Sequence, residues 1–237
     1  MPMSGMFNNY GSYINSQMAS LKKKFPDEKR FVNPFVTISR QTGAYGLTIA
    51  RDLCEYLQKN EKRPNCFWAG FDRELIAKVV EEHNLPEKVL PYLSETTISE
   101  IQDIMEELFD VHPSQYTLVH KTGETILHLA QLGYVVIVGM ASNIITAKLP
   151  GGVHIRLIGP LEARVKRIQE YYQMDEKKAM EFILVEDQNR KNYAKKYFEK
   201  DVDDPSLYDM VINTGGLKPQ EIVQVVGDFV LKRFSSR

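Results

Sequence analysis

Apolar segments of strand length alternate with longer segments of helical periodicity from residue 34 to the end of this chain. The segment YVVIV at 134–138 is apolar throughout, as expected of a strand that is buried on both faces. Four further segments have the length and apolar character of strands, namely 35–38, 66–71, 153–158 and 208–214. Apolar residues spaced by three and four positions predict the main helices, at 47–57, 114–132, 161–172, 175–200 and 219–234.

The alternation of strands and helices predicts an α/β fold with a doubly wound, five-stranded parallel sheet, whose ligands bind at the carboxyl ends of the strands. Residues 34–237 form one predicted domain, preceded by an N-terminal extension at 1–33. The section at about 74–132 is longer than a crossover requires, so we predict a helical insert over the sheet edge. A weakly helical stretch at 10–24 has three open interpretations: it packs on the domain, pairs with a second subunit in a homodimer, or does neither.

Composition excludes several classes of function. The 30 basic and 31 acidic residues give a net charge of -1, so no overall field attracts a nucleic acid polymer or an anionic membrane. Cys54 and Cys66 lack the spacing of metal ligands, which predicts reduced thiols and a cytoplasmic protein. No apolar run is long enough to span a bilayer, and the N-terminus lacks the apolar core of a signal peptide.

The turn after the first strand, in the stretch FVTISRQTGAYGLTIA at 35–50, is the strongest candidate site. A strand, a glycine turn and a helix direct backbone N–H groups and the positive end of a helix at one point, which suits a phosphate. Aligned with G-x-x-x-x-G-K-[ST], the turn has Gly46 and Thr48 in place, but Gln41 replaces the first glycine and Leu47 the lysine. The alternative interpretation is a tight turn whose glycines serve geometry only.

Five motifs occur in order along the chain: ISRQTGAYGLTIA (38–50), FDRELI (71–76), VIVG…N (136–143), HIRLIGPLEARVKRI (154–168) and DPSLYDMVINTG (204–215). On these motifs, residues 34 to 230 resemble the cytidylate kinase-like family of P-loop nucleoside monophosphate kinases. The resemblance implies the five-stranded sheet of that kinase type, a helical substrate-binding section and a lid at about 175–205. It also implies transfer of the ATP γ-phosphoryl group to a nucleoside monophosphate of the CMP or dCMP type, with Mg²⁺.

The resemblance further implies that the turn holds the donor phosphates, that Thr48 contacts Mg²⁺, and that the end of the fifth strand holds the adenine. The corresponding donor-site residues are Ser39, Arg40, Gln41, Thr42, Gly43, Ala44, Tyr45, Gly46, Leu47 and Thr48 in the turn, and Asn213, Thr214 and Gly215 at the strand end.

Three arginines are the predicted catalytic residues. Arg164 and Arg167 stand three positions apart in a predicted helix, so they share a face that can hold the donor phosphates. Arg190 lies in the lid segment, where the family supplies a transition-state arginine, and the guanidinium fork meets phosphate oxygens in two places. The alternative for all three residues is a solvated basic helix surface.

Asp72, Arg73 and Asn143 follow the second and third strands, where the resemblance implies the acceptor monophosphate. The alternative for Asp72 is a helix N-cap, which is compatible with a functional role. Four helical tyrosines could stack on a base, but packing is the favoured interpretation for them: Tyr171, Tyr172, Tyr193 and Tyr197.

Two departures from the family pattern leave a second function open. The turn has Gly43-Ala44-Tyr45-Gly46 where the family usually has Gly-Ser-Gly-Gly, and Tyr45 is a bulky ring that could stack on a base or cover the turn. Met140 stands where the family tends to have an arginine after the third strand, and Leu47 has no charge. A nucleotide-binding protein with little or no turnover, acting as a sensor or partner module, is therefore the alternative to a kinase. The retained arginines Arg164, Arg167 and Arg190 favour the kinase, because a protein that only binds has no need of a transition-state clamp.

Overall fold

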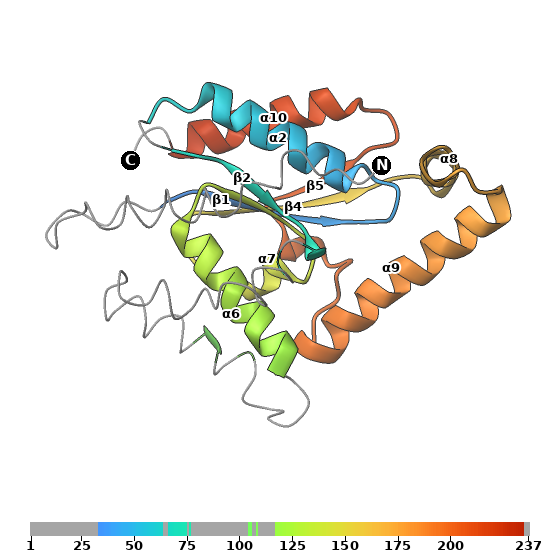
Figure 1. Cartoon of the computed structure of the whole chain (residues 1–237), viewed down its shortest axis with the longest axis horizontal. Coiled ribbons are helices and arrows are strands. Elements are labelled where there is room, and N and C mark those ends of the chain that lie inside the picture. The colour runs from blue at the N-terminus through green and yellow to red at the C-terminus, as the bar shows by residue number, and fades with distance from the viewer. Residues whose placement is uncertain are drawn as a thin grey trace, which may run out of the picture.

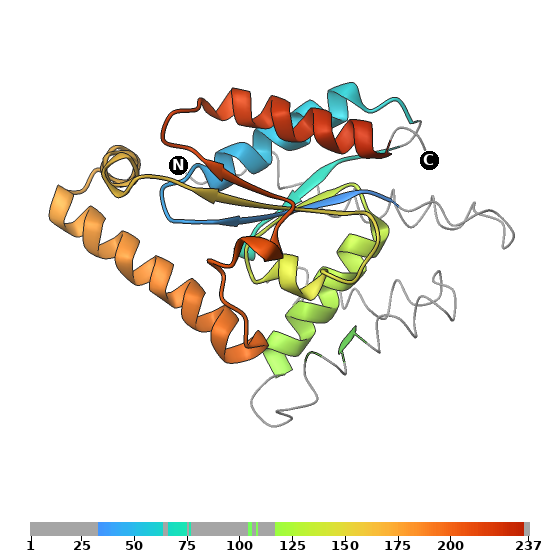
Figure 2. The ribbon, with the colours of Figure 1, turned by 180° about the vertical axis from the view of Figure 1, so that it is seen from behind.

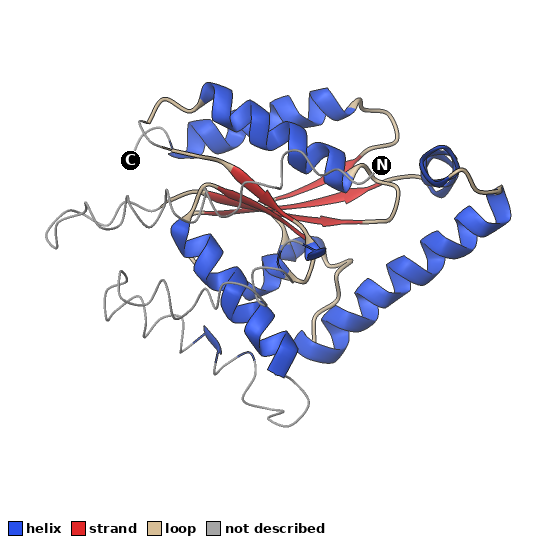
Figure 3. Ribbon diagram, in the orientation of Figure 1, coloured by secondary structure: helices blue, strands red, loops and turns tan. Residues whose placement is uncertain are grey.

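The computed structural model describes residues 33–63, 66–74, 76, 104–105, 108 and 117–234. Its five strands form one parallel sheet with the order β2-β3-β1-β4-β5, shown in Figure 3. The strands are β1 (Phe35–Arg40), β2 (Ala69–Phe71), β3 (Val135–Val138), β4 (Gly152–Ile158) and β5 (Met210–Asn213). The predicted α/β fold with a five-stranded parallel sheet is confirmed.

Helices cover both faces of this sheet (Figure 1). Helices α2 (Gly46–Asn60) and α10 (Pro219–Phe234) lie on one face, and α6 (Thr117–Leu132) and the short α7 (Ser142–Ile145) lie on the other. Helix α8 (Leu161–Tyr172) follows β4. The long α9 (Glu176–Phe198) then runs from α8 back toward the N-terminal end of α6. The 3-10 turn η3 (Pro205–Leu207) connects α9 to β5 beneath the sheet, as the reverse view shows (Figure 2).

The central strands are buried because both of their faces meet helices. All four residues of β3 are buried, as its uninterrupted apolar sequence predicts. In α2 the predicted apolar stripe reaches the sheet through Ala50, Leu53 and Leu57. Ile49 completes this stripe, whereas Leu47 is only half-buried at its edge. Helical periodicity therefore fixed the buried face of α2 to within one residue.

The buried face of α10 differs from the prediction. The sequence predicts a stripe of Ile222, Val225, Val226 and Phe229. Ile222 and Val226 are buried as predicted, but Val225 is 60% exposed and Phe229 is also exposed. Val223 and Val230 take their places on the buried face toward α2 and the sheet. Two apolar stripes lie side by side in this helix, and only contact with the rest of the protein selects one of them.

Several sequence predictions fall partly or wholly outside the described residues. The extension at 1–33 lies outside them except for Asn33, and so does most of the insert at 74–132 apart from α6 and a few single residues. The second strand is shorter than the predicted 66–71, since it begins only at Ala69. In the described part of the chain, every helix is too short or too polar to cross a membrane.

One buried and one half-buried histidine lead us to expect that this fold loses stability in acid. His128 on α6 and His154 on β4 both have a pKa below the ordinary value of 6.5, chiefly because burial disfavours the charged imidazolium. The unfolded chain then binds more protons than the folded one below pH 6.5, so stability falls as pH drops through that value. In His128→Leu the loss of unfolding free energy between pH 7.5 and 5.5 should shrink by about 1 kcal/mol, measured by urea titration. Equal losses in the two proteins would contradict this assignment.

Candidate functional site

The turn between β1 and α2 has the backbone shape of an anion-binding loop. Gly43 has a φ of 78° and Tyr45 a φ of 60°, both in the left-handed region. A Cβ on Gly43 would lie 2.8 Å from the carbonyl oxygen of Arg164, so the turn rests directly on α8. A tyrosine with positive φ is uncommon, and such strained residues cluster at functional sites.

The first turn of α2 presents unpaired donors beside this loop. The first intrahelical hydrogen bond is donated by the Ile49 N–H to the Tyr45 carbonyl, at 2.8 Å. Tyr45 is the N-cap residue and makes no capping bond through its side chain. Among the described residues, the N–H groups of Gly46, Leu47 and Thr48 have no acceptor. These groups and the positive helix end form the site that the sequence predicts for phosphate.

The three predicted catalytic arginines converge on this loop from α8 and α9. Arg164 donates to the carbonyl oxygen of Thr42 at 3.2 Å, and Arg167 donates to that of Gly43 at 3.1 Å. Arg190 donates to the Thr42 hydroxyl at 2.6 Å. Arg164 is only 7% exposed. The interpretation of this residue as part of a solvated helix face is therefore wrong.

Asp187 on α9 joins these groups, and the sequence analysis missed it. Its Oδ1 accepts from the N–H and the hydroxyl of Thr42 at 2.7 and 2.8 Å, and its Oδ2 pairs with Arg164 at 2.7 Å. Arg190 also reaches Oδ1, at 3.2 Å. One carboxylate thus fixes the loop and two arginines to each other. Its position three residues before Arg190, on the same helix face, was the available signal.

The Tyr45 ring packs against Arg167 of α8. The guanidinium carbon of Arg167 lies 3.9 Å from the centre of the Tyr45 ring, within cation–π range. Arg167 also donates to the hydroxyl and the carbonyl oxygen of Thr214, at 3.0 and 2.7 Å. Arg167 therefore connects the loop to the end of β5, where the resemblance implies the adenine.

Other predicted donor-site residues are held by protein partners. The Ser39 hydroxyl accepts from Arg156 and contacts the hydroxyl of Tyr208, so it points toward β4 and not into the loop. Gln41 accepts from the Gly159 N–H at 3.0 Å. The Asn213 side chain accepts from the Gly215 N–H at 2.9 Å within the turn after β5. The side chains of Ser39, Gln41 and Asn213 therefore stabilise the backbone around the site through hydrogen bonds within the protein.

The residues predicted for the acceptor lie after β2 and β3. Asp72 follows β2, and its carbonyl accepts from the Ile76 N–H at 3.0 Å, as at a helix start. Arg73 is exposed. Asn143 in α7 is 5% exposed, and in the described part of the chain its Nδ2 has no hydrogen-bond partner. An unpaired buried amide is costly, which fits a group that awaits a ligand.

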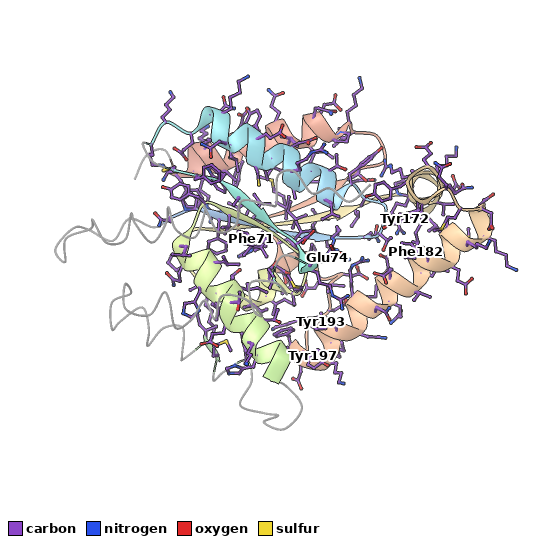
Figure 4. The ribbon with its side chains drawn as sticks, viewed as in Figure 1. Phe71, Glu74, Tyr172, Phe182, Tyr193 and Tyr197 are labelled. Atoms are coloured by element: carbon purple, nitrogen blue, oxygen red, sulfur yellow. The ribbon has the colours of Figure 1, made fainter. Side chains whose placement is uncertain are left out.

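The tyrosines divide into two pairs (Figure 4). Tyr193 and Tyr197 lie on the part of α9 nearest to α6 and pack against the core, as predicted. Tyr171 and Tyr172 are 60% and 51% exposed, so they lie outside the core and pack on neighbouring rings at the surface. Tyr172 contacts the ring of Phe182 where α8 and α9 meet.

Positions 47 and 140, where a lysine and an arginine are expected, carry uncharged side chains. Leu47 is half-buried against the core between the sheet and α2, and Met140 is partly buried against the core on the other face. Both side chains therefore contribute to packing. In the described residues, no three carboxylates, histidines or cysteines form a cluster that could hold a metal ion.

The profile of the cytidylate kinase-like family matches residues 35–216, which include all five strands and the helices α8 and α9. This chain belongs to the cytidylate kinase-like family. The resemblance predicted from the five motifs is confirmed. The family model covers the sheet and the helices around the loop, and it does not identify an acceptor.

Individual relatives are distant. The chain is 32% identical over 80 residues to a cytidylate kinase of Staphylothermus marinus, which is 34% of this chain and 45% of that protein. It is 28% identical over 99 residues to a uronate isomerase of Corynebacterium glutamicum, which is 42% of this chain and 19% of that protein. The chain thus spans less than half the length of these relatives.

A solved structure supports the fold over nearly the whole chain. An uncharacterized protein from Eubacterium ventriosum superposes with a TM-score of 0.54 and 21% identity. The superposition covers 86% of this chain and 100% of that one. At this identity the likeness concerns the fold and not the activity.

Proposed function

We propose that this protein transfers the γ-phosphoryl group of ATP to a nucleoside monophosphate of the CMP or dCMP type, in the cytoplasm. One observation carries the proposal: three arginines from two helices meet at a loop that also presents the unpaired N–H groups of a helix start. Phosphoryl transfer needs two phosphates in line and their charge neutralised, and little covalent chemistry from the protein.

In this proposal the loop and α2 hold the donor. The N–H groups of Gly46, Leu47 and Thr48 bind its phosphates, and Arg167 positions them beside the end of β5. The Thr48 hydroxyl stands in the first turn of α2, where an oxygen can complete the shell of a Mg²⁺ ion held mainly by phosphates and water. Such an ion, when bound, neutralises charge on the donor phosphates. The missing carboxylate cluster in the described residues is compatible with this arrangement.

The acceptor would lie between the end of β2 and α9. Asp72 and Arg73 follow β2, and Figure 4 shows Glu74 on the side of the sheet that faces α9. Arg190 projects from α9 to the Thr42 hydroxyl of the loop, and in this proposal it meets the phosphoryl group as it leaves the donor. An arginine there stabilises charge that develops during transfer. The lid formed by residues 175–205 would close over both substrates.

A second candidate is a nucleotide-binding protein with little turnover. Leu47 and Met140 favour it, because each replaces a cation that would neutralise phosphate charge. The contact of Arg190 with the loop favours the kinase, since binding alone does not require a transition-state arginine.

A pair of measurements separates these candidates. Calorimetry with ATP and Mg²⁺ reports binding, and a coupled assay with CMP, dCMP, UMP, AMP and GMP reports transfer. The kinase proposal expects ATP binding together with transfer that is fastest to CMP or dCMP. Binding without transfer to any acceptor would overturn it in favour of the sensor, and transfer mainly to another monophosphate would overturn the acceptor assignment.

A further inference from the structure

Arg40, the last residue of β1, follows an unusual path across the site. A Cβ on Gly46 would lie 2.7 Å from Cγ of Arg40, and a Cβ on Gly139 would lie 2.0 Å from its Nη1. The side chain therefore crosses the first residue of α2 and ends above the residue that follows β3. Only glycine at both positions leaves room for it. The guanidinium lies at the carboxyl edge of β1 and β3, where α/β sheets bind ligands.

Arg40 also differs from its neighbours in having no hydrogen-bond or ion-pair partner among the described residues. Arg164, Arg167 and Arg190 each make several hydrogen bonds. No hydrogen bond or ion pair to Arg40 occurs in the described part of the chain. Since guanidinium groups that leave water are normally paired, Arg40 has the features of a ligand-binding group without its ligand.

The charges that face Arg40 reinforce this conclusion. Burial and the nearby Arg190 lower its pKa to about 10, while Asp72, Glu186 and Asp187 act in the opposite direction. Glu186 and Asp187 already form ion pairs with Arg190, so their attraction for Arg40 is partly offset by that positive charge. Two arginines that face each other at a partly buried site repel, and an anion between them removes the repulsion.

We propose that Arg40 and Arg190 together bind the phosphoryl group in transfer, with Arg40 replacing the cations missing at Leu47 and Met140. The proposal rests on the proposed kinase function and names a further catalytic residue for it. An oxygen of the acceptor phosphate forms a bond to the γ-phosphorus while the bond to the bridging oxygen breaks, and that oxygen leaves with ADP. Arg40 reaches this point from β1, next to the loop and Asp72, whereas Arg190 reaches it from α9.

The experiment compares Arg40→Met, which keeps the length of the side chain without its charge, with the wild type. Calorimetry with inorganic triphosphate is the main readout, and its affinity should fall by about 10-fold or more. The melting temperature without ligand should stay the same or rise, because an unpaired, repelled charge is removed. A purely structural Arg40 would give a lower melting temperature. Lys59→Met, which removes an exposed charge at the far end of α2, is the matched control and should leave both quantities unchanged.

Unchanged triphosphate affinity in Arg40→Met would overturn the proposal. If that variant does not fold, Arg40→Lys tests the same point: it keeps the charge but not the fork, and it should bind triphosphate more weakly than the wild type. Wild-type affinity in Arg40→Lys would then overturn the proposal. A wild type that binds triphosphate but transfers to no monophosphate would overturn the kinase function alone, whereas no triphosphate binding would overturn both.

Discussion

Arg190→Ala is expected to reduce the rate of phosphoryl transfer by about 1,000-fold while changing the affinity for ATP less than about 3-fold. In the described part of the chain, Arg190 contacts the loop through the Thr42 hydroxyl, and its other partners Asp187 and Glu186 lie on its own helix. The N–H groups of α2 that would hold the donor do not depend on it. Its loss should therefore act on the transition state and not on donor binding. Steady-state kinetics with CMP, together with calorimetry of ATP binding, measures the two effects separately.

Lys195→Ala provides the matched control for Arg190. Lys195 lies on the same helix and carries the same charge, but its side chain is exposed. This variant should transfer at the wild-type rate. Normal turnover in Arg190→Ala would show that the lid arginine has no role in the reaction. Equal losses of rate and ATP affinity would assign it to donor binding instead.

Asp187→Ala is expected to lower the free energy of unfolding by about 3 kcal/mol. The change removes the acceptor of the Thr42 N–H and hydroxyl, and it leaves the guanidinium of Arg164 without its ion pair. The Arg164 side chain is 8% exposed, so water cannot easily replace the lost carboxylate. Urea denaturation of the two proteins without ligand gives the difference directly.

Two comparisons sharpen the test of Asp187. Glu181→Ala removes an exposed carboxylate from the same helix and should change the stability by less than about 0.5 kcal/mol. In Asp187→Ala and Arg164→Ala combined, the losses should be far from additive, because each single change breaks the same ion pair. Additive losses would mean that Asp187 does not hold the lid and loop together in solution.

Much of the architecture follows from local pattern. The apolar run at 134–138 predicted the buried β3, and the stripe through Ala50 and Leu53 predicted the face of α2. The same logic failed in α10, where Val225 belonged to a plausible stripe but lies in solvent. A helix with two adjacent apolar stripes carries no local information about which one the sheet will cover.

Most of the candidate site was predicted from the sequence, because its loop and helix start are formed by residues that are close together in the chain. The loop, the helix start and the pair Arg164 and Arg167 were predicted on spacing and resemblance. Asp187 was not, because its partner Thr42 is 145 residues away in the chain. The local signal, the position of Asp187 three residues before Arg190, places it on the same helix face but does not indicate its contact with Thr42.

The sequence by itself determined the order and type of the elements, the family, and the glycine loop at the carboxyl end of β1. These depend on periodicity and on residues close to each other in the chain. Only the tertiary structure decided that Asp187 binds the loop, that Tyr45 stacks on Arg167, and that the Arg40 guanidinium ends beside Gly139 without a partner among the described residues. These features involve segments that come together only when the sheet, α8 and α9 are assembled. Whether a charged side chain is paired is therefore decided by the tertiary structure and not by its neighbours in the chain.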